Sequence, residues 1–437
     1  MSRDEPPASA LRRLGRLGGL IGRVGVSVAA SRLLELGQAE PARRTRRSEN
    51  LVRNATRIVQ TLGEMKGAAM KLGQMLSLHD GLLPPEVAQV LRSLQREAPK
   101  VPAEVMQYEL RGALPAFDQL FESIEPEAFA AASIGQVHRG RLRDGRRVAV
   151  KIQYPLIDEI IKADLKNLRV VLQSLFRLFS DADFEPVWRE VRERLLEELD
   201  YTIEADHAKR VAQLYAGDPQ IVVPRVIDEA TATRILTMER IEGITPAEAC
   251  SERHDQPARD RWGLALFDFV LSGLLEHRFL HADPNLANFA FREDGRIIVY
   301  DFGCMKRVPV ALARGYARLM RAAVDRRPDE IPAILHDIGV MREDGRPIER
   351  ELIAPYFDLF AEIVRPAPPY AFGENERLYE RLVELGISHW TEAADIRFPE
   401  DIVFIDRALS GHFGNLTRLG ASGPWRERVL HHTAAIG

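Results

Sequence analysis

The chain has 437 residues, of which 46% are apolar and 28% charged, a composition that excludes a mainly disordered or collagen-like chain. Its 60 lysines and arginines against 64 acidic residues give a formal net charge of −4, which excludes general electrostatic binding of nucleic acid. Two cysteines, Cys250 and Cys304, are too few for a disulfide framework or a structural zinc site, so we expect a reducing compartment.

The N-terminal 60 residues are basic, because they hold 12 arginines, no lysine and 5 acidic residues. From Leu11 to Val28, apolar side chains recur at helical spacing with arginines largely opposite them. These arginines are Arg12, Arg13, Arg16 and Arg23. The stretch is too charged for a simple spanning helix, and it has no clear signal-peptide core. Two interpretations stay open: a helix on an anionic membrane surface, or a helix packed on its own domain with its arginines in water.

The next segments predict helices and then a small sheet. Residues 41–50 are typical of a polar linker, and 51–100 of helices with an unusual density of glycine. Two β-prone runs, Ser133–Arg141 and Arg146–Ile152, flank Asp144 and Gly145, which predicts a hairpin. Further along we expect helices over 156–215 and 259–280, strands over 221–226, 232–238 and 297–300, a turn at 292–295, and mainly helices after about 309 with a Pro-rich break at 366–373. The order of elements predicts an α+β fold.

A lysine ends the second strand of the predicted hairpin, in the sequence VAVK, and could reach the phosphates of a nucleotide. This residue is Lys151. Upstream lies AAAS, where a kinase places its glycine-rich phosphate cover, and the other interpretation of AAAS is a tight packing site. The candidate phosphate-contacting residues are Ala130, Ala131, Ala132 and Ser133. Glu204, within EELDYTIEA, is the carboxylate that we expect to orient the lysine.

Two further motifs supply acidic and amide oxygens. In HADPNLAN, Asp283 and Asn288 have the offset of the kinase catalytic loop, where a carboxylate acts as base and an amide oxygen holds a metal. Asp301 of DFG comes thirteen residues after Asn288, directly after a predicted strand. Its carboxylate suits Mg²⁺ that bridges phosphates. The lysine strand, this loop and DFG in this order predict nucleotide binding of the phosphoryl-transfer type.

Together these motifs resemble the UbiB/ADCK (AarF-type) family of atypical protein-kinase-like proteins. The motifs that carry the resemblance are KLGQ (71–74), AAASIGQVH (130–138), VAVKIQYP (148–155), ELDYTIE (198–204), HADPNLAN (281–288) and YDFG (300–303). The resemblance implies a bilobal kinase-like fold with an added N-terminal helical extension. It divides the chain into a basic segment and linker (1–45), a KxGQ extension (46–125), a small β-rich N-lobe with a helical insert (126–240) and a helical C-lobe (241–437).

The resemblance also implies roles for individual residues. Lys71 of KxGQ would lie in the cleft, paired with Glu198 of the ExD motif that ends at Asp200. The hinge that holds adenine would run from Met238 through Glu239 to Ile241. Asp283 would be the base, Lys151 would pair with Glu204, and Asn288 and Asp301 would bind the metal. Ala282 stands where ordinary protein kinases have arginine, which argues against activation-loop control through that arginine.

The expected cofactors are ATP and Mg²⁺, and the expected function is an atypical kinase or ATPase that supports ubiquinone or other isoprenoid-quinone metabolism. The partners would be a quinone-type lipid and a membrane surface contacted through residues 11–34, with a homodimer as one arrangement and no nucleic acid. We expect a cytoplasmic protein peripheral to the membrane. Two alternatives stay open: a small-molecule kinase of the aminoglycoside or choline kinase type, since HADPNLAN also resembles their loop, and a nucleotide-switched scaffold.

Overall fold

The computed structural model describes residues 101–437, apart from 133, 160, 163–164, 166–168, 170–172, 174–184, 368, 375–377, 379–380, 382–384, 386–394, 435 and 437. The described residues form two compact units. The first runs up to Ile203 and includes Ile227–Glu239, and the second contains Glu204–Val226 and everything from Arg240 onward. The expected basic segment and linker (1–45) and residues 46–100 of the KxGQ extension lie outside the described residues.

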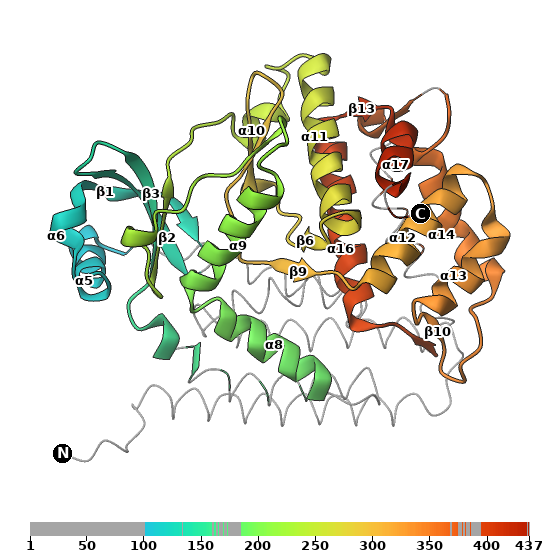
Figure 1. The fold of residues 1–437 in the computed structure, drawn as a ribbon, viewed down its shortest axis with the longest axis horizontal. Coiled ribbons are helices and arrows are strands. Elements are labelled where there is room, and N and C mark those ends of the chain that lie inside the picture. The colour runs from blue at the N-terminus through green and yellow to red at the C-terminus, as the bar shows by residue number, and fades with distance from the viewer. Residues whose placement is uncertain are drawn as a thin grey trace, which may run out of the picture. The chain divides into compact units, whose positions relative to one another are not determined.

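The first unit is built on a four-stranded antiparallel sheet in the order β1-β2-β3-β5 (Figure 1). Its elements are α5 (Ala103–Ala113), α6 (Phe117–Leu120), β1 (Phe121–Ala132), β2 (Gly135–Leu142), β3 (Arg147–Gln153), α8 (Glu185–Glu197), η1 (Asp228–Ala230) and β5 (Ile235–Glu239). Side chains alternate between faces along β3, so Val148, Val150 and Ile152 are buried on one face. Residues of α5 and α6, among them Leu110 and Phe117, complete this core.

The predicted hairpin is confirmed. Gly145 adopts a φ of +88°, which glycine reaches without steric cost, and β2 and β3 pair from Arg141↔Arg147 to Gly135↔Gln153. The sheet begins earlier than the sequence pattern indicated, because β1 starts at Phe121. The β1–β2 register shifts between Ile124 and Ala128, on either side of Pro126. An edge strand tolerates proline there, since proline has no N–H for the ladder.

The helix α9 (Tyr201–Leu214) spans the boundary of the two units, and the second unit is mainly helical. Its other helices are α10 (Pro246–Ala249), α11 (Gln256–Leu275), η2 (Leu286–Asn288), α12 (Val310–Val324), η3 (Pro328–Glu330), α13 (Ile331–Asp337), α14 (Arg350–Ile363), η4 (Phe372–Glu374), α16 (Glu400–Leu419) and α17 (Trp425–Ala434). Its strands are β4 (Ile221–Val222), β6 (Phe279–His281), β7 (Phe289–Phe291), β8 (Ile297–Val299), β9 (Met305–Arg307), β10 (Met341–Arg342), β11 (Tyr370–Ala371), β12 (Ile396–Arg397) and β13 (Ser422–Gly423).

The long helix α11 is the centre of the second unit. Asp255 caps its N-terminus by accepting a hydrogen bond from the backbone N–H of Ala258. The helix is buried on nearly all sides from Trp262 to Leu275, as expected for a helix inside a core. It packs against α16, α12 and α17, and α16 lies behind it in Figure 1.

Two sequence predictions in this unit are wrong in their bounds. The helix expected over 259–280 ends at Leu275, because Phe279–His281 pairs with Met305–Arg307 as the ribbon β6–β9. The strand expected over 221–226 is only two residues long, paired in parallel with β8. In the part of the chain that the structure describes, no helix is both long enough and apolar enough to cross a membrane.

Candidate active site

The loop between β6 and β7 carries the predicted base and the predicted amide ligand. Asn288 donates a hydrogen bond from Nδ2 to Oδ2 of Asp283 at 2.9 Å. The other oxygen of Asp283 accepts the backbone N–H of Asn285 at 3.2 Å, and Asn285 in turn caps η2 through the N–H of Ala287 at 3.1 Å. The loop therefore holds the Asp283 carboxylate by its own backbone and side chains.

The β7–β8 hairpin brings Asp301 to the same loop. Phe289 pairs with Val299, and the N–H of Tyr300 donates to the carbonyl of Asn288 at 2.9 Å, so the next residue, Asp301, follows directly beside the loop. His281 holds the backbone of Asp301, because its Nε2 donates to the Asp301 carbonyl at 2.8 Å. The three residues predicted as base and metal ligands are thus close together at the ends of β6, β7 and β8.

Helix α9 holds the DFG backbone through two residues one turn apart. Glu204 is 5% exposed, and its Oε1 lies 3.5 Å from the backbone nitrogen of Phe302. His207 donates from Nδ1 to the Phe302 carbonyl at 3.1 Å, and the Phe302 side chain is completely buried. The sequence interpretation missed His207, although its spacing of three from Glu204 places both on one helix face.

The first unit carries the other predicted residues. Lys151 lies on β3, on the face opposite the buried valines, with Nζ 5.1 Å from the centroid of the Tyr201 ring. Ala130, Ala131 and Ala132 end β1, where they pair with β2. The pairing of Lys151 with Glu204, which belongs to the second unit, stays a prediction, as does the role of the alanines in phosphate binding.

The ExD motif has a structural explanation for its second acid. Asp200 caps α9, because Oδ1 accepts both the backbone N–H of Thr202 at 3.0 Å and the Thr202 hydroxyl at 2.6 Å. Glu198 is half-buried between α8 and α9. Lys71 and Ser133 lie outside the described residues, so the pairing of Lys71 with Glu198 stays a prediction.

The predicted hinge divides between the units. Met238 and Glu239 end β5, whereas Ile241 belongs to the second unit and accepts the Tyr300 hydroxyl at 2.8 Å on its carbonyl. Burial raises the pKa of Tyr300 to about 12, so this hydroxyl stays a donor at neutral pH. Gly243 follows, where a Cβ would lie 2.8 Å from Cδ1 of Ile298 and 2.9 Å from Cβ of Ala290, so only glycine fits without a shift.

The donor set fits Mg²⁺ held jointly with phosphates. Asn288 uses its amide nitrogen toward Asp283, which turns its Oδ1 away from that carboxylate, and Asp301 supplies a hard carboxylate. Among the described residues, no group of three or more His, Cys, Asp or Glu side chains could hold a metal ion. Mg²⁺ bound through one or two protein oxygens, with substrate phosphates and water completing its shell, matches this set.

A family model, the ABC1 atypical kinase-like domain, matches residues 93–335, more than half of the chain. The chain belongs to the ABC1 atypical kinase-like family. Among its relatives, the rat protein "Atypical kinase COQ8B, mitochondrial" is 32% identical over 421 residues, which cover 95% of this chain and 79% of that protein. The zebrafish protein of the same name is 37% identical over 327 residues, 72% of this chain, but the match spans only 51% of the zebrafish protein.

A solved structure supports the same fold. The structure of Rv3197 from Mycobacterium tuberculosis, in complex with erythromycin, is 28% identical, covers 84% of this chain and 92% of that chain, and superposes with a TM-score of 0.62. The fold is therefore kinase-like: the first unit is its sheet-rich N-lobe and the second its helical C-lobe. Within the ABC1 match lie Lys151, Glu204, Asp283, Asn288 and Asp301.

Proposed function

We propose that this ABC1 protein is an ATP-binding, Mg²⁺-dependent atypical kinase or ATPase. The observation that carries the proposal is the convergence of Asp283, Asn288 and Asp301, held by the 2.9 Å contact between Asn288 and Asp283 and the 2.8 Å contact from His281 to Asp301. These are the parts that position a nucleophile and a metal–phosphate complex in phosphoryl transfer.

Each residue then has a defined task. Asp283 accepts the proton of the attacking hydroxyl or water, Lys151 pairs with the phosphates, and Glu204 orients Lys151. Asn288 and Asp301 would hold Mg²⁺, which neutralises charge on the phosphate oxygens when bound. Met238, Glu239 and Ile241 would receive adenine through their backbone groups.

The biological setting that we propose is isoprenoid-quinone metabolism, ubiquinone included, at a membrane surface. Support comes from the two relatives named COQ8B, which are called mitochondrial, and from the basic segment 11–34. In this proposal the protein contacts the membrane peripherally from the cytoplasmic side, and its lipid partner is of the quinone type.

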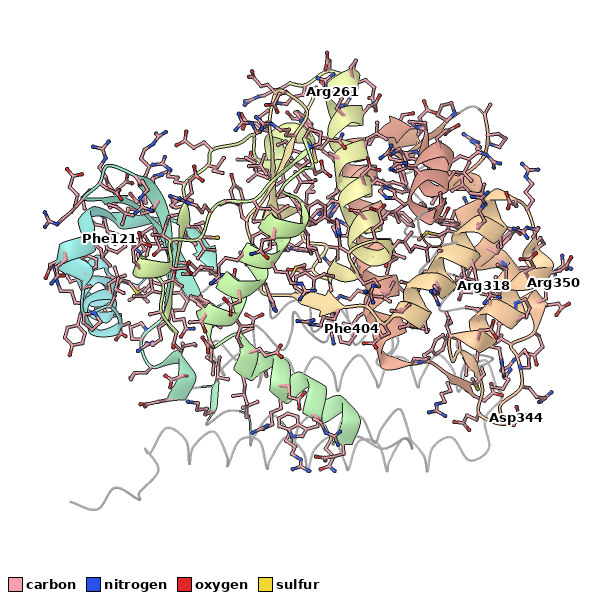
Figure 2. The ribbon with its side chains drawn as sticks, in the orientation of Figure 1. Phe121, Arg261, Arg318, Asp344, Arg350 and Phe404 are labelled. Atoms are coloured by element: carbon pink, nitrogen blue, oxygen red, sulfur yellow. The ribbon has the colours of Figure 1, made fainter. Side chains whose placement is uncertain are left out.

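The first test measures ATP hydrolysis with MgATP, in the presence and absence of liposomes. Asp283→Asn should lower turnover about a hundredfold or more, because general-base catalysis contributes at least that factor. Asp344→Asn is the matched control, since Asp344 lies on an exposed turn and pairs with Arg346 (Figure 2). Equal loss in both variants, or no turnover in the parent, would count against the proposal.

The second test concerns the metal site. Asp301→Asn replaces a charged ligand by a neutral one of the same shape, so the thermal stabilisation by MgATP should disappear while the fold is kept. Circular dichroism checks the fold. An unchanged stabilisation by MgATP in the variant would remove Asp301 from the metal site.

The small-molecule kinase alternative has a direct probe, because the Mycobacterium tuberculosis relative was solved with erythromycin. Incubation with MgATP and erythromycin, followed by mass spectrometry of the antibiotic, would reveal a transferred phosphoryl group. Transfer to the antibiotic would favour this alternative over a lipid-linked ATPase.

A further inference from the structure

Helix α16 contacts the catalytic loop from a position more than a hundred residues later in the chain. Arg407, Gly411 and Asn415 are spaced four apart, so they lie on one face of the helix. All three contact the loop from Ala282 to Pro284, which contains Asp283.

Two side chains of this face hydrogen-bond to the loop backbone on either side of Asp283. Arg407 donates from Nη2 to the carbonyl of Ala282 at 2.8 Å. Asn415 donates from Nδ2 to the carbonyl of Pro284 at 2.7 Å, and its side chain is buried. The peptide units that flank the predicted base are therefore fixed from α16.

The middle of the face fits closely against the loop. A Cβ at Gly411 would lie 2.3 Å from Cγ and 2.5 Å from Cβ of Pro284. His412, only 3% exposed, packs edge-on against Phe289, with ring centroids 5.8 Å apart. Burial lowers the pKa of His412 to about 3, so the ring is neutral where it packs against Phe289.

The helix is itself anchored to the core of the second unit. Gln256 at the start of α11 donates to the carbonyl of Gly420 at 2.7 Å, and Tyr316 of α12 donates to Asp406 at 2.5 Å. Phe404, labelled in Figure 2, lies near the other end of the helix. The centroid of its ring is 4.0 Å from Nζ of Lys306 on β9 and 5.8 Å from Cζ of Arg407. A helix held at both ends can transmit a fixed position to the loop.

We propose that α16 positions the catalytic loop, with Arg407, Gly411 and Asn415 as positioning residues that set the place of the Asp283 carboxylate. The loop residue Ala282 has no functional side chain, and its backbone is held by Arg407 on one side and by its N–H to the Cys304 carbonyl at 2.8 Å on the other. The kinetic part of this inference rests on the proposed function, and the structural part does not.

The test uses two identical substitutions on the same helix. Gly411→Ala places a methyl group against Pro284, whereas Gly414→Ala adds one where no atom lies within 4 Å. Gly411→Ala should lower kcat for ATP hydrolysis by about tenfold to a hundredfold, because displacement of a catalytic group by about 1 Å has that effect. The KM for ATP should change less than kcat, since Lys151, Asp301 and the hinge lie outside this loop, although Asn288 lies within it. Gly414→Ala should leave both constants unchanged.

Hydrogen exchange tests the positioning without any need for turnover. The amides of Asn285, Ala287 and Asn288 are hydrogen-bonded inside the loop. In Gly411→Ala these amides should exchange about tenfold faster than in the parent, and in Gly414→Ala at the parent rate. If the parent hydrolyses no ATP, the proposed function fails, and the exchange result still decides whether α16 positions the loop.

A second pair of variants covers the case in which Gly411→Ala does not fold. Arg407→Met removes the donor to Ala282, and Arg407→Lys keeps a cationic donor. Arg407→Met should show the fall in kcat and the faster exchange, and Arg407→Lys should restore both in part. Parent-like exchange and kcat in Gly411→Ala and in Arg407→Met would overturn the inference, as would an equal fall in thermal stability and kcat across all four variants.

Discussion

Gly135→Ala tests how closely β2 and β3 approach beside the predicted phosphate cover. Gly135 pairs with Gln153 on β3 and with Ala132 at the end of β1. A Cβ at this position would lie 2.1 Å from the backbone oxygen of Ile152, and separations under 3.0 Å are essentially never seen. The two strands must therefore move apart by about 0.9 Å, since no flexible side chain can yield.

The cost follows from what that movement breaks. The N–H of Tyr154 donates to the Ile134 carbonyl at 2.9 Å, and the same displacement takes this bond beyond hydrogen-bonding distance. A lost hydrogen bond costs about 1 kcal/mol and overpacking about 1–3 kcal/mol, so we expect a loss of about 2–4 kcal/mol in the free energy of unfolding. Because the unfolding entropy is about 2.1 cal/mol/K per residue, the melting temperature of a chain of 437 residues should fall by about 2–4 °C.

Thermal unfolding followed by circular dichroism measures this change, and a fluorescent ATP analogue measures the accompanying loss of nucleotide affinity. Gly112→Ala is the matched control, because no atom lies within 4 Å of its Cβ position in α5. Alanine there should leave stability unchanged or raise it by up to about 1 kcal/mol. Equal melting temperatures for the parent and Gly135→Ala would refute the close approach of β2 and β3.

Three further predictions concern other parts of the chain. Burial acts to lower the pKa of His432, but hydrogen bonds to Asp268 and Glu276 outweigh it and the pKa lies above its ordinary value of 6.5. The two ion pairs of His432 therefore stabilise the fold fully below pH 6.5, and this stabilisation should be lost as the pH rises through the folded-state pKa. Urea unfolding from pH 6 to 9 should show a falling free energy of unfolding in the parent and a flatter pH profile in His432→Gln. A variant with Arg12→Gln, Arg13→Gln, Arg16→Gln and Arg23→Gln should sediment less with anionic liposomes and unchanged with neutral ones, because each of these arginines contributes about 1 kcal/mol near an anionic surface. Equal sedimentation of variant and parent would favour a helix packed on its own domain. Ala131→Gly should loosen the end of β1 and raise autophosphorylation, measured by intact mass after incubation with MgATP, whereas a mass distribution identical to that of the parent would show that the alanines do not restrain transfer.

The sequence determined the features that depend on short spacing. The hairpin was predictable because Asp144 and Gly145 specify a turn between two alternating runs, and Gly145 adopts the expected positive φ of +88°. The grouping of Asp283, Asn288 and Asp301 was predictable for a similar reason, since one loop and one hairpin connect them. The family resemblance needed only these motifs and their order.

The bounds of several elements depended on partners far away in the chain. Phe279 and Leu280 extend the apolar pattern of α11, but they pair with Arg307 and Lys306, and this pairing decides that they form a strand. The start of β1 is rich in glutamate and includes Pro126, so its local preference for a strand is weak. It becomes a strand because β2 supplies the hydrogen bonds.

The support of the site is decided by tertiary structure alone. His207 reaches Phe302 across 95 positions, and Arg407 and Asn415 reach the catalytic loop across 125 and 131 positions. Each forms its contact with a backbone carbonyl, which every residue type possesses, so no side-chain motif in the loop signals the partner. Spacing within the sequence therefore identifies the groups that do the chemistry, whereas the packing of distant helices selects the groups that hold them in place.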